Sequence, residues 1–192
     1  MFHIQDDKRS RLSARLIFAG LVSLQIKVPY DQITVSTLSE TAGVGRSTFY
    51  RLFDNKDDIL LYRAMQLFIE LRDNNAGTIL SKHELGEEDF FLPFFQFWFS
   101  HRKFLKLLIE CDKWAIFDEA LYVFIEENLP FIKVIMSFNE TEWLYFINLR
   151  VGLLSAALET AVRYNYAKMS EGHDYAEWLV QLLKRLSSRP LP

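Results

Sequence analysis

Five side chains between residues 46 and 51 carry groups that proteins use to contact nucleic acid. They are two guanidinium groups, two hydroxyls and one phenol, in the order Arg46, Ser47, Thr48, Tyr50 and Arg51. Guanidinium groups bind phosphate oxygens and guanine edges, and hydroxyls and phenols donate to the nucleic-acid backbone. This pattern indicates binding of double-stranded DNA, although the same charges on an isolated helix would be ordinary solvated residues.

A pair of short helices is needed to hold these side chains on one face. Thr34 suits the N-cap of a first helix, Gly43 suits its end, and a second helix is expected from about Arg46 to Phe53. The apolar residues of the segment are spaced to form one small core, namely Val35, Leu38, Ala42, Val44, Phe49, Leu52 and Phe53. Two short helices joined by a glycine turn are typical of a DNA-binding helix-turn-helix.

The run AGVGRSTFYRLF at residues 42–53, followed by Asn55, Lys56 and Asp57, resembles the signature of TetR-type transcriptional regulators. In that family a hydrophobic first helix precedes a Thr-capped second helix, then A-G-V, a T-[FL]-Y-x-x-F recognition helix and a lysine. The similarity extends over roughly residues 8–60. It implies that Arg46 contacts a base edge and that phosphates contact Thr34, Tyr50 and Lys56. The full implied DNA-binding set is Thr34, Gly45, Arg46, Ser47, Thr48, Tyr50, Arg51 and Lys56.

Two positions depart from the family pattern. Ser39 stands where alanine is usual, and its hydroxyl is expected to bond back to a carbonyl of its own helix. Gly45 stands where serine is usual, which removes a side chain at the start of the recognition helix. We therefore expect base specificity to depend on Arg46 and Thr48.

Charge and aromatic residues divide the chain near residue 57. Residues 1–56 hold eight basic and five acidic side chains, a net charge of +3, whereas residues 57–192 have a net charge of −6 and 13 of the 17 Phe. We expect residues 1–56 to form a helix-turn-helix DNA-binding domain and residues 57–192 a helical ligand-binding and dimerisation domain. Seven Gly, five Pro and no alternating pattern predict an all-α fold of nine or ten helices.

The aromatic residues of the second domain mostly indicate core packing. The resemblance implies that some of them also line a pocket for an apolar or aromatic small ligand, since ligand pockets are largely apolar. The candidate lining residues are Phe94, Phe97, Trp98, His101, Cys111, Trp114 and Phe117.

The last two long helices are expected over residues 140–167 and 174–186 and carry an apolar stripe. The resemblance implies that they pair with their copies in a homodimer, and packing within one chain is the alternative for the same stripe. The candidate interface residues are Leu154, Leu158, Val162, Trp178 and Leu182. Such a dimer would place two recognition helices on successive major-groove faces of a palindromic operator.

Enzymatic activity is not expected, and neither is a metal or a cofactor. The four histidines lack metal-binding spacing, Cys111 lies in no motif, and no glycine-rich phosphate loop occurs. The single cysteine fits a reducing cytoplasm. The charged segment at residues 1–10 lacks a secretory signal, and the apolar run at residues 90–99 is too short to span a membrane.

The sequence thus predicts a cytoplasmic, homodimeric transcriptional regulator, specifically a repressor released by a small apolar ligand. Two alternatives stay open at this point. One is an all-α ligand-binding or adaptor protein of the same fold that has lost DNA binding, and the other is a ligand-dependent activator.

Overall fold

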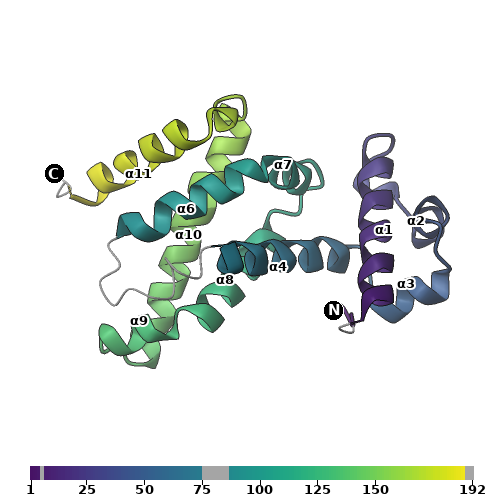
Figure 1. Cartoon of the computed structure of the whole chain (residues 1–192), viewed down its shortest axis with the longest axis horizontal. Helices are drawn as coiled ribbons and strands as arrows, with labels where there is room; N and C mark the ends of the chain where they lie inside the picture. Colours follow the sequence, from purple (N-terminus) through teal and green to yellow (C-terminus); the bar gives the residue numbers. More distant parts are fainter. Residues whose placement is uncertain (5–6, 75–86, 189–192) are drawn as a thin grey trace. The chain divides into compact units, whose positions relative to one another are not determined.

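The computed structural model describes residues 1–4, 7–74 and 87–188, and within these ranges it contains ten α-helices, two 3₁₀ turns and no strand (Figure 1). The predicted all-α fold is therefore confirmed. The polar run SKHELGEED at residues 81–89 predicts a surface connection, and most of it lies outside the described residues. The helices are α1 (Lys8–Gln25), α2 (Val35–Ala42), α3 (Arg46–Leu52), α4 (Asp57–Asn74), α6 (Glu87–Ser100), α7 (Arg102–Glu110), α8 (Ala115–Asn128), α9 (Pro130–Ile135), α10 (Glu140–Asn165) and α11 (His173–Ser188), with the 3₁₀ turns η1 (Tyr30–Gln32) and η2 (Lys168–Glu171).

Local capping residues set the bounds of α2. The Thr34 hydroxyl accepts from the amide of Thr37 at 3.1 Å, and the Thr37 hydroxyl accepts from the amide of Thr34 at 3.2 Å, which is a reciprocal capping box. Gly43 ends the helix in the left-handed conformation with φ of +66°, where glycine carries no steric penalty. Both ends of this helix lie where the sequence predicts them.

Asn55 is a residue type that favours helix N-termini, and it caps the start of α4. The side-chain oxygen of Asn55 accepts from the amides of Asp57 and Asp58 at 2.8 and 3.2 Å. In return, the buried carboxylate of Asp58 accepts from the amide of Asn55 at 3.1 Å. These bonds satisfy amides that have no partner within the helix, and they bring α4 close behind the end of α3.

The core of the amino-terminal helices depends on a close crossing of α1 and α2. A Cβ added to Gly20 would lie 3.2 Å from the Cβ of Ala42, so the absence of a side chain at Gly20 permits this approach. Apolar side chains of α1, α2, α3 and α4 close the core around the crossing, and these are Ala14, Ile17, Leu21, Leu38, Phe49, Leu52, Phe53, Ile59 and Leu60.

The chain forms two compact units, one of Met1–Leu67 with Leu107–Leu129 and one of Phe68–Lys106 with Pro130–Pro192. The first unit thus extends beyond residue 56 into α4 and includes α8. The boundary between residues 56 and 57 stays a prediction, because compactness alone does not test which segment binds DNA.

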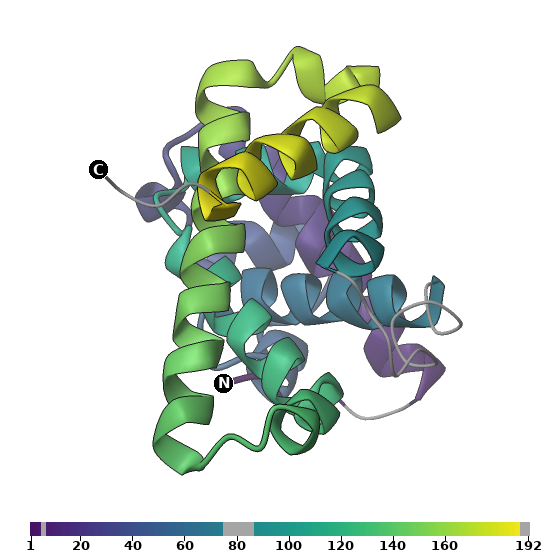
Figure 2. The same cartoon turned by 90° about the vertical axis from the view of Figure 1, so that its left-hand side faces the viewer.

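In the second unit, α6 and α11 lie side by side and α11 crosses α10 (Figures 1 and 2). The ring of Phe99 on α6 stacks on Tyr175 of α11 with 5.2 Å between centroids. The ring of Phe68 meets Trp98 edge to face at 4.9 Å. Aromatic pairs of this kind add to the stabilisation from burial, so much of the aromatic excess of this part of the chain is core.

The structure corrects one local expectation, which concerns Ser39. This side chain is 3% exposed, and its hydroxyl has no hydrogen-bond partner among the described residues, so it does not bond back to its own helix. The position lies on the buried side of α2, next to the tight crossing with α1, where alanine would leave no polar atom without a partner.

We therefore predict that Ser39→Ala stabilises the amino-terminal helices by about 1 kcal/mol, because it removes a buried hydroxyl whose desolvation is not offset. Urea unfolding followed by circular dichroism measures this change. Ser36→Ala, at an exposed position of the same helix, is the matched control and should leave the free energy of unfolding nearly unchanged. A destabilised Ser39→Ala variant would show that the hydroxyl has a partner in solution.

Candidate nucleic-acid interface

The helix α3 presents two different faces. Phe49 and Leu52 are almost fully buried, whereas Arg46, Ser47 and Arg51 are exposed. Thr48 lies half-buried at the edge between the faces. The arrangement matches the outward set expected from the spacing of the sequence.

Tyr50 distinguishes this face from an ordinary solvated surface. Its side chain is 56% exposed in the middle of α3, and its ring meets Phe49 only edge to face, at 5.4 Å between centroids. A phenol held in this way gains little from packing, because most of its apolar surface still faces water. It is well placed to donate to a phosphate.

Gly45 precedes α3 in an extended conformation, with φ of −71° and ψ of 148°. A Cβ at this position would make only an ordinary contact, 3.6 Å from the hydroxyl oxygen of Ser47. The fold therefore does not require glycine here. What glycine changes is the surface at the start of α3, which is left without a side chain beside Arg46.

Lys56 has partners within the protein. Its ammonium group donates to the carbonyls of Tyr30 and Ile33 at 2.6 and 3.2 Å, and it lies 4.4 Å from the centre of the Tyr30 ring. An ammonium group has three protons, so two are used inside the protein and one is left for another acceptor. Lys56 thus anchors the turn that leads into α2, a role that the sequence did not reveal.

A second contact on the same turn joins three elements of the first unit. The hydroxyl of Tyr30 donates to Asp57 at 2.7 Å, and the ammonium group of Lys113, in the turn before α8, lies 2.9 Å from the other carboxylate oxygen. We call these four residues, Tyr30, Lys56, Asp57 and Lys113, the Tyr30 network.

Charge and burial shift the pKa values within the Tyr30 network. Burial, together with the bond to Asp57, raises the pKa of Tyr30 far above its ordinary value, so the phenol stays protonated. Burial alone would raise the pKa of Asp57, but the bonds from Tyr30 and Lys113 outweigh it and the net shift is downward. The bond to Asp57 raises the pKa of Lys113. The network is therefore charged and complete at neutral pH.

The amino-terminal segment lies against the end of α3, which the sequence also did not reveal. The amide of His3 donates to the carbonyl of Leu52 at 2.8 Å, and the amide of Asp54 donates to the carbonyl of Met1 at 3.2 Å. The ring of Phe2 packs edge to face on Tyr62 of α4 at 5.2 Å. These contacts tie the end of α3 to α4.

The residues predicted to bind a ligand lie in two groups. Phe94, Phe97, Trp98 and His101 belong to α6 or directly follow it in the second unit, and Cys111, Trp114 and Phe117 belong to the first unit. His101 has partners nearby, since its Nδ1 lies 2.9 Å from the carbonyl of Phe97 and its ring lies tilted against the Phe97 ring with 4.3 Å between centroids. Burial raises the pKa of the Cys111 thiol to about 11, which leaves it protonated at neutral pH. A ligand pocket at these residues stays a prediction.

The residues predicted at the dimer interface also divide into two groups. Leu154, Leu158 and Val162 are buried in the core of the chain itself. Trp178 is 48% exposed, and with Leu182 it borders an apolar groove of about 290 Å³ between α10 and α11. The exposed face of α10 next to this groove carries other apolar residues, namely Leu144, Tyr145, Leu149 and Leu153.

Two features of the described residues bear on metal binding and on membrane insertion. The described residues contain no group of three or more His, Cys, Asp or Glu side chains that could hold a metal ion. One described helix, α10, is long and apolar enough by length and composition to cross a membrane, with 33% of its most apolar window buried in the chain. Core helices of soluble proteins satisfy the same criterion.

Comparison with known proteins supports DNA binding by the amino-terminal helices. Residues 17–62 match the model of the family described as bacterial regulatory proteins, tetR family. Over 78 residues the chain is 32% identical to the HTH-type dhaKLM operon transcriptional activator DhaS of Lactococcus lactis subsp. lactis (strain IL1403). This stretch covers 41% of the chain and 42% of DhaS, so the chain spans less than half the length of the curated relative that it matches. No solved structure matches the chain significantly.

The helices α2 and α3 and the exposed basic face of α3 define an amino-terminal domain of the helix-turn-helix class. The matched segment runs from the second half of α1 into α4 and includes every residue of the implied DNA-binding set, from Thr34 to Lys56. Over this segment the chain is similar to the tetR family of bacterial regulatory proteins, which confirms the resemblance seen in the sequence.

We predict that Asp57→Asn lowers the stability of the first unit by about 1 kcal/mol at neutral pH, because it weakens two charge-assisted bonds of a carboxylate that is still 42% exposed to screening solvent. The pKa of Asp57 is lowered in the folded state, so its contribution is present above the ordinary carboxyl pKa and is lost as pH falls through the lowered value. Thermal unfolding should therefore show a lower unfolding temperature for Asp57→Asn than for wild type at neutral pH. This difference should narrow below about pH 4.

Glu40→Gln, at an exposed carboxylate of α2, is the control for a simple loss of charge and should leave the unfolding temperature unchanged. If the unfolding temperatures of wild type and Asp57→Asn differ by the same amount from neutral to acid pH, the role of the ionised carboxylate is contradicted.

Proposed function

We propose that this protein is a homodimeric, sequence-specific regulator of transcription whose affinity for DNA changes when a small apolar ligand binds. The observation that carries the proposal is the exposed face of α3, where Arg46, Tyr50 and Arg51 project from a well-packed helix-turn-helix. Such regulators act on the chromosome, so we place the protein in the cytoplasm. No enzymatic role is proposed.

Within the DNA-binding face the residues have different roles. Arg46, at the start of α3, is proposed to read a guanine edge in the major groove through its two-pronged guanidinium group. Tyr50, Arg51 and Thr34 are proposed to contact phosphates, which fix orientation without reading sequence. Ser47 and Thr48 are proposed to contribute hydroxyl contacts beside Arg46. Lys56 contributes chiefly by holding the turn before α2, because two of its protons are already bonded.

The dimer is proposed to form through the exposed face of α10 together with the groove beside α11. Leu149 is 72% exposed and Leu153 is 40% exposed, and the small residues Gly152 and Ala156 lie between and beside them. Small residues let helix backbones approach closely, and a two-fold axis makes the same patch serve both protomers. Leu154, Leu158 and Val162 then support this face from inside, and Trp178 and Leu182 meet the partner.

A ligand site in the aromatic second domain is proposed from the family resemblance and from the apolar composition around α6. The ligand is expected to be apolar or aromatic. It shifts operator affinity only if it binds the DNA-competent and DNA-incompetent states of the dimer with different affinities. Release of DNA on ligand binding is the direction that we propose.

Repression is our proposal for the effect on transcription, whereas DhaS is named an activator. Selection of bound fragments from random DNA, followed by transcription from a promoter that carries the selected site, tests both points. Reduced transcript supports repression and increased transcript supports activation. Failure to enrich any sequence at low salt would instead favour a ligand-binding or adaptor protein without DNA binding.

We predict that Arg46→Ala and Arg51→Ala weaken DNA binding in different ways. Loss of a base contact at Arg46 should cost about 1–3 kcal/mol on the selected site and relax preference at one base position. Loss of a phosphate contact at Arg51 should weaken binding to all sequences and reduce the salt slope by about one unit. Fluorescence anisotropy with selected and random duplexes at several salt concentrations separates the two. Equal losses on both duplexes for Arg46→Ala would refute its role as a base reader.

We predict that Leu153→Arg separates the dimer. The substitution places an unpaired charge at the proposed interface twice, once from each protomer, so the dimer dissociation constant should rise at least about a hundredfold. Sedimentation equilibrium of the full chain measures the change.

Ile69→Arg is the matched control, because Ile69 is an equally exposed apolar residue, at 41%, on α4 outside the proposed face. A Leu153→Arg protein that sediments as the wild type does would overturn the proposed interface. Sedimentation of the wild-type chain with membranes would show that the exposed face of α10 meets lipid instead of a second copy.

A further inference from the structure

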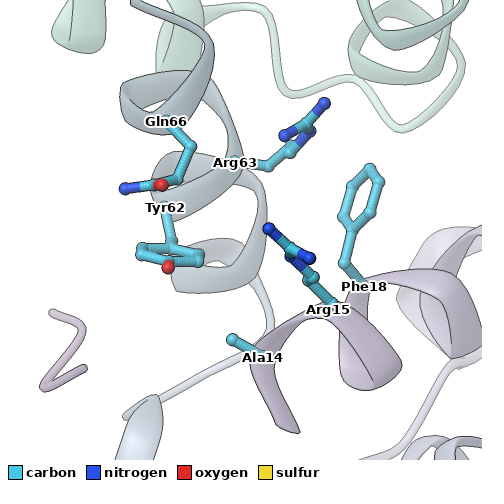
Figure 3. Close-up of a pocket in the computed structure, with 6 residues that line it drawn as sticks. All are labelled: Ala14, Arg15, Phe18, Tyr62, Arg63 and Gln66. Carbon is cyan, nitrogen blue, oxygen red and sulfur yellow. The ribbon is translucent and has the colours of Figure 1, made fainter. Parts of the chain in front are cut away.

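A crevice of about 350 Å³ lies between α1 and the first half of α4, both in the first unit (Figure 3). Its volume is at the lower end of the range for small-molecule sites. The close contact of α1 with α2 is made at Gly20, which does not line the crevice, whereas Ala14 borders both the crevice and the core. The lining residues are Ala14, Arg15, Phe18, Tyr62, Arg63 and Gln66.

Two guanidinium groups line this crevice. Arg15 projects from α1 toward α4, and Arg63 projects from α4 on the side of Phe18 (Figure 3). The lining contains no acidic residue, and in the part of the chain that the structure describes neither arginine forms an ion pair. The like charges of Arg15 and Arg63 repel each other, and an anion bound between them offsets this repulsion. This juxtaposition has no evident purpose in packing.

The walls beside the arginines are apolar and aromatic. The guanidinium group of Arg63 lies 5.9 Å from the centre of the Phe18 ring, and Ala14 forms a buried part of the α1 wall. On the α4 side, the half-buried Tyr62 ring is followed one turn later by the amide of Gln66. The crevice therefore combines a positive centre with flat apolar surfaces and two further hydrogen-bonding groups.

The positive field in this crevice acts on Tyr62. Burial raises the pKa of the phenol, and the charges of Arg11, Arg15 and Arg63 each pull it in the opposite direction. Three cations thus lie close enough to Tyr62 to act on the pKa of its phenol, and Tyr62 is one of the residues that line the crevice.

We propose that this crevice binds a small oxyanion, a phosphate ester or a carboxylate, attached to an apolar or aromatic group. Arg15 from α1 and Arg63 from α4 both donate to the oxyanion, because a guanidinium group offers paired N–H donors that match carboxylate and phosphate oxygens. Phe18 and Tyr62 contact the apolar part, and Gln66 donates to a remaining oxygen. The site is separate from the apolar ligand site proposed for the second domain and does not depend on DNA binding.

Calorimetric titration of the full-length chain at constant ionic strength tests the proposal with four probes. Phenyl phosphate and benzoate carry both features, inorganic phosphate lacks the ring and benzyl alcohol lacks the charge. We expect a single saturable site for phenyl phosphate or benzoate, weaker binding of inorganic phosphate and none of benzyl alcohol. Arg15→Gln and Arg63→Gln should each raise the dissociation constant of the aryl anion at least about tenfold.

Arg72→Gln is the matched control, because it removes the same charge from the same helix at a residue that does not line the crevice. It should leave the dissociation constant unchanged. A second measurement needs no variant: the side-chain amide signal of Gln66 in the wild-type NMR spectrum should shift on titration with phenyl phosphate. Equal weakening by all three variants would show general charge attraction and overturn the proposal, as would the absence of any Gln66 shift.

The same arginines would behave differently if DNA were their ligand. In that case Arg63→Gln would reduce the salt slope of DNA binding by about one unit while the aryl anions gave no saturable heat. That result would overturn the small-anion site and leave the proposed DNA-binding function of α3 intact. Binding of phenyl phosphate by a protein that selects no DNA sequence would leave the small-anion site standing and refute the proposed function instead.

Discussion

The bond between the ammonium group of Lys56 and the carbonyls of Tyr30 and Ile33 holds the turn from which α2 begins. The carbonyl of Tyr30 already accepts from the amide of Ile33 at 3.1 Å within the turn, and the ammonium group adds a charge-assisted bond to this carbonyl and to that of Ile33. The next residue, Asp57, binds the hydroxyl of Tyr30, so adjacent residues at the start of α4 hold both the backbone and the side chain of the turn. Thr34 caps α2 one residue after Ile33, and α3 packs on α2. The position of the DNA-binding face relative to α4 thus depends on this anchor.

Helix limits and the faces of α3 could be predicted because their causes are local. Gly43 and Asn55 act on amides and carbonyls within four residues, and the spacing of Phe49 and Leu52 decides which side of α3 is buried. The partners of Lys56 lie 23 and 26 residues earlier, and Lys113 lies 56 residues after Asp57. Because nothing in the residue types specifies such pairings, the sequence predicts only a phosphate contact for Lys56 and no role for Lys113.

The apolar stripe of α10 shows a different limit of sequence reasoning. Periodicity shows that residues such as Leu154 and Leu158 lie on one side of the helix, but it does not tell which neighbour covers that side. In the structure the chain's own core covers it, and a second apolar side with Leu149 and Leu153 is left exposed. A helix with apolar side chains on two sides buries both only if it has a partner on each. The exposed side is therefore stronger support for a second protomer than the stripe that first suggested one.

The charge of the amino-terminal helices supports the proposal that two protomers bind DNA together. Of the basic residues there, Arg15 is turned into the crevice beside α4, and Lys56 uses two protons within the protein. Arg46 and Arg51 are the cations that α3 itself presents. Affinity from phosphate neutralisation falls with salt by about 0.9 per contact on a logarithmic scale, so a face with two or three cations gives a slope of only about −2 to −3. Binding that survives physiological salt then requires both faces of a dimer to engage at once, because linked contacts add their free energies without a second loss of translational freedom.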